Sequence, residues 1–236
     1  MTYQSLYRKY RPTQFEDVIG QETIVKSLEN SIIKNKISHA YLFTGPRGTG
    51  KTTMAKLMAK SINCTDEGKV ICGQCESCKQ ADAGSHPDIV EIDAASNNGV
   101  EEIRTLIERV KFTPIIGDYK VYIIDEVHML SQGAFNALLK TLEEPPSHVV
   151  FILATTEIHK VLPTIISRCQ RYDFSRIDSD LISKRLDQIV ESENREIEKG
   201  ASSVIASLSG GGMRNALTIL EQALILNDDL ITKDAI

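Results

Sequence analysis

Short apolar runs alternate with segments of helical period over the first three quarters of the chain. The runs predict strands at Ala40–Thr44, Lys120–Ile124 and Val149–Ala154, and two segments of mixed polarity, Asp88–Asp93 and Gln170–Phe174, are also expected to be strands. Helical segments lie before and between these strands. This alternation predicts an α/β fold with a parallel five-stranded sheet flanked by helices. The run Val149–Ala154 is too apolar to have a solvated face, so we expect it to be a central strand.

From about Asp178 the strand-like runs stop and only helical patterns remain. They predict helices at Leu181–Val190, Ala201–Leu208 and Met213–Leu226. We therefore expect an α/β domain over residues 1–177 and a small helical domain over residues 178–236.

A glycine-rich loop follows the first predicted strand and precedes a helix-forming segment. Its sequence is Gly45-Pro46-Arg47-Gly48-Thr49-Gly50-Lys51-Thr52, and Thr53 continues into the helix. This order of strand, glycine loop and helix is typical of a phosphate-binding P-loop. Backbone N–H groups and the positive end of the helix dipole favour an anion there. We expect Lys51 to reach the β- and γ-phosphates of a nucleoside triphosphate and the Thr52 hydroxyl to bind Mg²⁺.

The predicted strand Lys120–Ile124 ends in two carboxylates, Asp125 and Glu126. Carboxylates at the carboxyl end of a parallel strand are the expected partners of a P-loop. We expect Asp125 to hold Mg²⁺ and Glu126 to act as general base toward the attacking water. Thr155 and Thr156 end the next strand, so their hydroxyls should lie at the same edge.

Four of the five cysteines are clustered in the pattern C-x7-C-x2-C-x2-C, at Cys64, Cys72, Cys75 and Cys78. Four thiolates at this spacing can close on one tetrahedral Zn²⁺, with a structural role because no ligand position stays open. An iron–sulfur cluster is the alternative that also uses four cysteines. Disulfides are disfavoured because a cytosolic compartment keeps thiols reduced. Cys169 lies apart and is expected to be a small buried apolar residue.

Two segments before the P-loop leave two interpretations open. Tyr7-Arg8-Lys9-Tyr10-Arg11-Pro12 is basic and aromatic, and Val18 and Ile19 follow it. The segment is either a partly ordered lead-in to a helix over Glu22–Asn35 or a strap across the nucleotide base. Further along, Asn98 precedes a helical pattern and is a plausible N-cap.

Composition limits the class of protein. The 236 residues are 42% hydrophobic and 25% charged, which is ordinary for a globular chain with a full core. The net charge of −5 argues against general nucleic-acid binding but permits a local site. No apolar run has the length of a membrane span, and the first residues lack a signal-peptide pattern, so we expect a cytoplasmic protein with no membrane partner.

The motifs together resemble the AAA+ ATPase subunits of bacterial clamp loaders, which serve the DNA polymerase III holoenzyme. The resemblance covers the chain from end to end, and the cysteine module separates it from the eukaryotic and archaeal relatives. It rests on the segments Tyr7–Pro12, Gly45–Thr52, Asp125–Leu130, Asn136–Pro146, Ala154–Thr156 and Ser167–Cys169, and on the four clustered cysteines.

The resemblance implies further site residues. Thr156 would be the sensor-1 residue, and Arg214 would be the sensor-2 arginine that reaches the γ-phosphate from a helical lid. Arg168 would be an arginine finger that serves the ATP of a neighbouring subunit. The strip around the adenine would consist of Tyr7, Arg11, Pro12, Val18 and Ile19. Contacts to DNA phosphates would come from the helix starts near Asn97-Asn98-Gly99 and Ser131-Gln132, with Lys140 nearby.

The resemblance also implies a function. The chain would be a motor subunit that uses ATP to open a ring-shaped sliding clamp and place it on primer–template DNA. Its partners would be the other clamp-loader subunits of a hetero-pentamer. Family members continue into a collar domain, so we expect this chain to be a monomeric fragment. The alternatives are another DNA-processing AAA+ motor, such as a Holliday-junction branch migrator, and a non-catalytic scaffold subunit. The presence of Lys51, Thr52, Asp125 and Glu126 argues against a scaffold.

Overall fold

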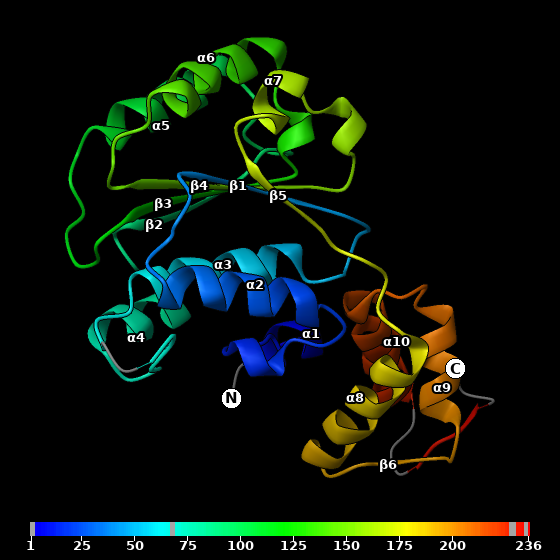
Figure 1. The fold of residues 1–236 in the computed structure, drawn as a ribbon. Coiled ribbons are helices and arrows are strands. Elements are labelled where there is room, and N and C mark those ends of the chain that lie inside the picture. The colour runs from blue at the N-terminus through cyan, green and yellow to red at the C-terminus, as the bar shows by residue number, and fades with distance from the viewer. Residues whose placement is uncertain (1–2, 67–68, 227–229, 234–235) are drawn as a thin grey trace.

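A parallel sheet forms the centre of the computed structural model, which describes residues 3–66, 69–226, 230–233 and 236 (Figure 1). The strand order is β2-β3-β4-β1-β5, and every pairing in this sheet is parallel. The five predicted strands are thus confirmed. Their bounds are β1 (Ala40–Thr44), β2 (Ile89–Asp93), β3 (Lys120–Asp125), β4 (Val149–Thr155) and β5 (Gln170–Asp173).

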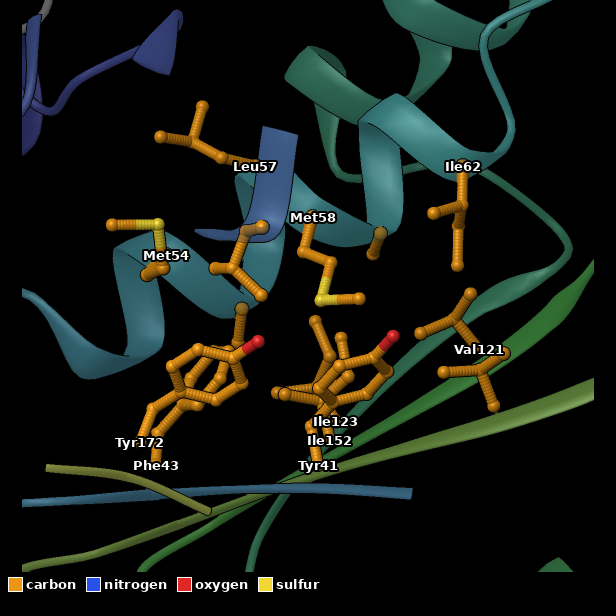
Figure 2. Packing of buried hydrophobic residues seen from close by; sticks show 14 of the residues in the cluster. Tyr41, Phe43, Met54, Leu57, Met58, Ile62, Val121, Ile123, Ile152 and Tyr172 are labelled. Carbon is orange, nitrogen blue, oxygen red and sulfur yellow. The ribbon is translucent and has the colours of Figure 1, made fainter. Parts of the chain in front are cut away.

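Helices cover both faces of the sheet (Figure 1). One face carries α2 (Glu22–Ile33) and α3 (Lys51–Ile62), and the other carries α5 (Val100–Val110), α6 (Gln132–Glu143) and α7 (Pro163–Ile166). Figure 2 shows how Met58 of α3 points toward the sheet, where Tyr41, Ile123 and Ile152 lie, and Met54 belongs to the same buried cluster. Because both faces are covered, β1 and β4 are buried along their whole length.

Strand β4 is inserted between β1 and β3, as its continuous apolar sequence predicts. Thr44 at the end of β1 pairs with Thr155, and Ile124 near the end of β3 pairs with Leu153. The carboxyl ends of the three strands therefore meet at one edge. This register brings the P-loop, Asp125-Glu126 and Thr155-Thr156 together.

A group of helices follows the sheet and has a core of its own. It contains α8 (Ser179–Ser192), α9 (Ala201–Leu208) and α10 (Met213–Leu226), whose packed residues include Ile182, Leu186, Ile205 and Leu220. The expectation of helices alone is wrong in one detail. The strands β6 (Glu196–Ile197) and β7 (Leu230–Ile231) pair in parallel. Each has two residues, which is too short for a period-2 pattern to reveal.

The short helix α1 (Leu6–Lys9) opens the described chain but packs with this helical group, because Leu6 belongs to the core of the group. A 3-10 turn, η1 (Phe15–Asp17), follows α1. The division at residues 177 and 178 stays a prediction, and α1 shows that the two parts are interleaved at the start of the chain.

Helix α4 (Glu76–Ala83) adds an element that the sequence did not predict, and the start of α5 corrects one prediction. The second C-x2-C segment is the first turn of α4, with Cys75 as its N-cap and Gly84 at φ 68° after its end. The N-cap of α5 is Gly99 and not Asn98, because the helix starts at Val100. The Asn98 carbonyl instead accepts a hydrogen bond from the Ser131 N–H at 3.0 Å, which joins the starts of α5 and α6.

Two further 3-10 turns follow strand ends, η2 (Val127–Met129) after β3 and η3 (Ile158–Lys160) after β4. Helix α2 ends two residues before its predicted end, since Asn35 adopts a left-handed conformation at φ 50°. None of the helices in the described residues is long and apolar enough to cross a membrane.

Candidate nucleotide-binding site and cysteine cluster

A cleft of about 650 Å³ lies between the carboxyl edge of the sheet and the helical group. Most of the predicted nucleotide site lines this cleft. The predicted residues that line it are Tyr7, Arg11, Pro12, Val18, Ile19, Arg47, Gly48, Thr49, Gly50, Lys51, Thr52, Thr53, Asp125, Glu126, Thr156 and Arg214. Gly45 and Pro46 are not among the lining residues, although their carbonyl groups bind Lys51.

The P-loop has the conformation that its glycines permit. Gly48 and Gly50 have φ values of 80° and 100°, which residues with a Cβ rarely adopt, and Gly50 is the N-cap of α3. The Lys51 ammonium is buried and donates to the Gly45 and Pro46 carbonyls, both at 2.8 Å. Burial lowers the pKa of Lys51, while the nearby charges of Glu126 and Asp125 oppose this shift. A buried cation thus faces the cleft at the start of a helix, where an anion is favoured.

Thr52 and Asp125 are in direct contact across the site. The Thr52 hydroxyl donates to Asp125 Oδ2 at 2.6 Å, and the Glu126 N–H donates to Asp125 Oδ1 at 3.0 Å. A hydroxyl and a carboxylate are oxygen ligands of the kind that Mg²⁺ prefers. The two residues expected to hold a magnesium ion are therefore side by side.

Glu126 is fixed by the end of β4. It adopts a left-handed conformation with φ 48°, which turns its side chain away from the line of β3. The Thr156 N–H and hydroxyl both donate to Glu126 Oε2, at 3.2 and 2.9 Å. The nearly buried His128 ring lies 3.3 Å from the same oxygen and 3.0 Å from the Thr155 hydroxyl. The candidate base thus has a defined position next to Asp125.

The helical group supplies the other wall of the cleft. Arg214, in the first turn of α10, lines the cleft, and its guanidinium carbon lies 4.9 Å from the centre of the Tyr7 ring. The P-loop and α10 approach closely, since a Cβ added to Gly212 would lie 3.0 Å from the Arg47 carbonyl oxygen. The segment from Tyr7 to Ile19 runs along the cleft. This position favours the strap interpretation over a partly ordered lead-in.

Arg168 is another predicted site residue that does not line the cleft. It precedes β5, at the amino edge of the sheet, whereas the P-loop follows β1 at the carboxyl edge. Its guanidinium donates to Glu143 Oε1 at 2.8 Å and to the Thr164 carbonyl at 2.6 Å. The side chain remains partly exposed.

Several residues of the cleft were not predicted from the sequence. Asp93 lies at the end of β2, His128 in η2, and Arg185 in α8, and all three line the cleft. Asp93 could have been identified as another strand-end carboxylate. The α8 pattern carries no signal for Arg185, because only the packing of α8 within the helical group, on the other side of the cleft from the P-loop, brings that side chain to the cleft.

The four clustered cysteines are brought together as predicted. Their Sγ atoms all lie within 4.8 Å of one another. A tetrahedral Zn²⁺ with Zn–S bonds of about 2.3 Å requires sulfurs roughly 3.8 Å apart. Cys72 and Cys78, whose sulfurs are 3.9 Å apart, already match this separation. The cluster is therefore consistent with zinc.

Backbone N–H groups surround the sulfurs of this cluster. Cys72 Sγ accepts from the N–H groups of Gln74 and Cys75, at 3.4 and 3.2 Å, and Cys75 Sγ accepts from Cys78 N–H at 3.4 Å. Burial opposes ionisation of Cys75, but the N–H donors of Thr65 and Cys78 outweigh it and lower its pKa to about 6. Burial raises the pKa of Cys78. N–H donors around sulfur stabilise the thiolate, which is the metal-binding form.

Comparisons with known proteins identify the family to which the chain belongs. A family model described as "DNA polymerase III, delta subunit" matches residues 20–178. A second, described as "DNA polymerase III clamp loader subunit, ATPase lid domain", matches residues 181–229. The first match covers more than half of the chain, so the chain belongs to the family of DNA polymerase III clamp-loader subunits.

Within this family the chain is similar to the tau/gamma subunits. DNA polymerase III subunit tau of Bacillus subtilis is 58% identical over 235 residues, which are 98% of this chain and 41% of that protein. Subunit tau of Escherichia coli is 45% identical over 237 residues, which are 100% of this chain and 37% of that protein. The chain thus spans less than half the length of these relatives. The resemblance inferred from the motifs is confirmed.

Solved structures show the same fold. The structure titled "Thermotoga maritima RuvB Holliday junction branch migration motor" has a TM-score of 0.67 and 20% sequence identity, and the match covers 96% of this chain and 70% of that one. A point variant of RuvB from the same organism has a TM-score of 0.68 at the same identity. At this identity the likeness supports the AAA+ fold alone. The family models favour the clamp loader over the branch migrator that the sequence also suggested.

Proposed function

We propose that this chain is the ATPase core of a clamp-loader motor subunit, acting in the bacterial cytoplasm. One observation carries the proposal: five functional groups line the same cleft. They are Lys51, Thr52, Asp125 and Glu126 from the sheet and its loops, and Arg214 from the helical group of α8, α9 and α10, which we call the lid. A scaffold subunit would not require these five groups together.

ATP would bind with its phosphates at the P-loop and its base toward the strap. The Lys51 ammonium and the N–H groups at the start of α3 would bind the phosphate oxygens. The adenine would lie against Tyr7, Arg11, Pro12, Val18 and Ile19, which line the same cleft. Thr52 and Asp125 would hold Mg²⁺, which neutralises phosphate charge when bound.

Glu126 would accept the proton of the attacking water. The two hydrogen bonds from Thr156 support this role, because they fix one carboxylate oxygen and leave the other available.

Thr156 and Arg214 would then contact the γ-phosphate from opposite walls of the cleft. Hydrolysis would also need charge stabilisation from outside the chain, because Arg168 lies at the opposite edge of the sheet.

Arg168 would serve the site of a neighbouring subunit. It is partly exposed, and its contacts to Glu143 and Thr164 hold it at the surface. An arginine supplied by a neighbour stabilises the charge that develops on the transferred phosphoryl group. ATP bound at one subunit would therefore be hydrolysed only in the assembled loader.

The cysteine cluster would hold a structural Zn²⁺ through Cys64, Cys72, Cys75 and Cys78. The closed set of four sulfurs leaves no position for a water or substrate, which supports a structural role. The ion would tie the chain just after α3, at Cys64, to the start of α4, at Cys75 and Cys78.

Primer–template DNA would bind at the paired starts of α5 and α6. The Ser131 N–H bond to the Asn98 carbonyl keeps these starts adjacent, and Asn97, Asn98 and Gln132 are exposed there. Helix N-termini can bind phosphates without a basic side chain. Lys140 is exposed further along α6.

The test is ATP hydrolysis by the subunit reconstituted with companion loader subunits. We expect the rate to rise when sliding clamp and primer–template DNA are both present. If the hydrolysis rate is the same with and without the clamp but rises with Holliday-junction DNA, the result would contradict the proposal and support a branch migrator. No hydrolysis under any of these conditions would support a scaffold.

A further inference from the structure

Helix α1 is bound to the helical lid at both of its ends, by hydrogen bonds at one end and an ion pair at the other. The Leu6 N–H and the Tyr3 hydroxyl donate to Glu221 Oε1 of α10, at 2.9 and 2.6 Å. At the other end of α1, the Lys9 ammonium lies 2.7 Å from Glu193, which follows α8. Leu6 is buried in the lid core. Helix α1 should therefore move with the lid and not with the sheet.

The anchor at Glu221 aligns α1 with Arg214. The two residues are two helical turns apart on α10, so their side chains share one face of the helix. Tyr7, one residue after Leu6, consequently lies against Arg214, with 4.9 Å between the guanidinium carbon and the ring centre. The Arg8 guanidinium approaches the same ring less closely, at 5.7 Å.

The N–H donors of the Arg214 side chain are available. In the part of the chain that the structure describes, the guanidinium contacts the Tyr7 ring but donates no hydrogen bond to another group of the chain. Within the described residues, no carboxylate forms an ion pair with Arg214. A phosphate could therefore bind Arg214 without first displacing a salt bridge.

We propose that Tyr7 is a positioning residue for Arg214, holding its guanidinium in the cleft for the terminal phosphate of a bound nucleoside triphosphate. This inference rests on the proposed function, since it requires a nucleotide in the cleft. It adds a residue from the start of the chain to the γ-phosphate side of the site. Tyr7 has then two roles, a contact for the base and a support for the arginine.

The test compares Tyr7→Leu with Tyr7→Phe in titrations with ATP and with ADP, both with Mg²⁺. Tyr7→Leu should weaken ATP binding about two- to fivefold more than it weakens ADP binding, the equivalent of a cation–π contact at an accessible site. ADP keeps the base but lacks the terminal phosphate, so its affinity should fall only by the loss of the base contact. Tyr7→Phe keeps the aromatic face and should bind ATP like the wild type. If Tyr7→Leu does not fold, Tyr7→Met serves as the variant without a ring.

A double-mutant cycle separates positioning from packing. In an Arg214→Ala background, Tyr7→Leu should weaken ATP binding no more than it weakens ADP binding. Equal losses for ATP and ADP in the otherwise wild-type chain, or the same loss of ATP affinity in the Arg214→Ala background, would mean that Tyr7 acts only through the base or through the packing of α1, and the inference would be overturned. Wild-type ATP affinity in Tyr7→Leu would overturn it as well. Failure of the wild-type chain to bind ATP at all would instead overturn the proposed function.

Discussion

Glu126 and His128 illustrate what single residues contribute at the strand ends. Glu126 leaves β3 in a left-handed conformation, and its carboxylate is bound by Thr156 from β4. His128 lies between Glu126 and Glu157, with its Nε2 atom 3.4 Å from Glu157 Oε1. The position of the candidate base therefore depends on groups from two strands and the turns that follow them.

The first prediction concerns Glu126→Gln. The amide keeps the size of the side chain and can still accept from Thr156, but it cannot take the proton of water. We expect ATP affinity to be unchanged, with hydrolysis in the assembled loader slower by about 10²- to 10⁴-fold. Nucleotide titration and single-turnover hydrolysis measure the two effects separately. Turnover at the wild-type rate would show that another group is the base.

At the scale of elements, the sequence predicts the sheet because β1, β3 and β4 are nearly continuous apolar runs. The run Val149–Ala154 even indicates its central position, since a strand without a polar face must be covered on both sides. Helix α4 and the β6–β7 pair are not predicted, for different reasons. The residues of α4 include a cysteine of the clustered motif, so the segment was interpreted as a metal-binding motif and not as a helix. Strands of two residues show no sequence pattern and form only because they pair with each other.

The candidate site likewise contains residues that the sequence predicts and residues that it does not. Lys51, Thr52, Asp125 and Glu126 are identifiable because each belongs to a motif that is continuous in sequence. Arg185 and the contact between Tyr7 and Arg214 are not, because distant helices create them. Asn98 failed as a predicted N-cap because helix starts are ambiguous by a residue when adjacent positions can both cap.

The cysteine module gives the second prediction, with Cys169 as an internal control. Bound Zn²⁺ should protect Cys64, Cys72, Cys75 and Cys78 from alkylation at pH 8, and a chelator should expose them. Burial raises the pKa of Cys169 to about 12. At pH 8 only roughly 10⁻⁴ of that thiol is ionised, so it should react slowly with or without chelator, and tenfold faster per added pH unit.

The metal itself is measured by elemental analysis. We expect about one zinc per chain, its loss in Cys75→Ser, and a lower melting temperature after chelation, because metal-binding free energy stabilises the folded module. Iron in place of zinc would support the cluster alternative. Four reactive thiols with no metal and unchanged melting would contradict a metal site.

For the whole molecule, the third prediction follows from the place of Arg168 at the edge opposite its own P-loop. In the assembled loader, Arg168→Ala should leave nucleotide affinity nearly unchanged and lower stimulated hydrolysis by about 10³- to 10⁵-fold. Arg171→Ala is a matched control, since Arg171 is also partly exposed at β5 and pairs with Asp173. The chain alone should hydrolyse ATP very slowly. A fast rate that does not depend on protein concentration would show that one chain contains a complete site.

ATP binding in the cleft between the P-loop and the lid is the central step of the proposed function. Equilibrium titration with Mg²⁺ and ATP tests this directly, using Lys51→Ala and the control Lys56→Ala on the same helix. Lys56 pairs with Glu91 at 2.6 Å and does not line the cleft. We predict one ATP per wild-type chain, unchanged affinity in Lys56→Ala, and a loss of at least about 1.5–3 kcal/mol in Lys51→Ala, which is roughly 10- to 150-fold. Equal affinity in Lys51→Ala and the wild type, or no binding to either, would contradict the account.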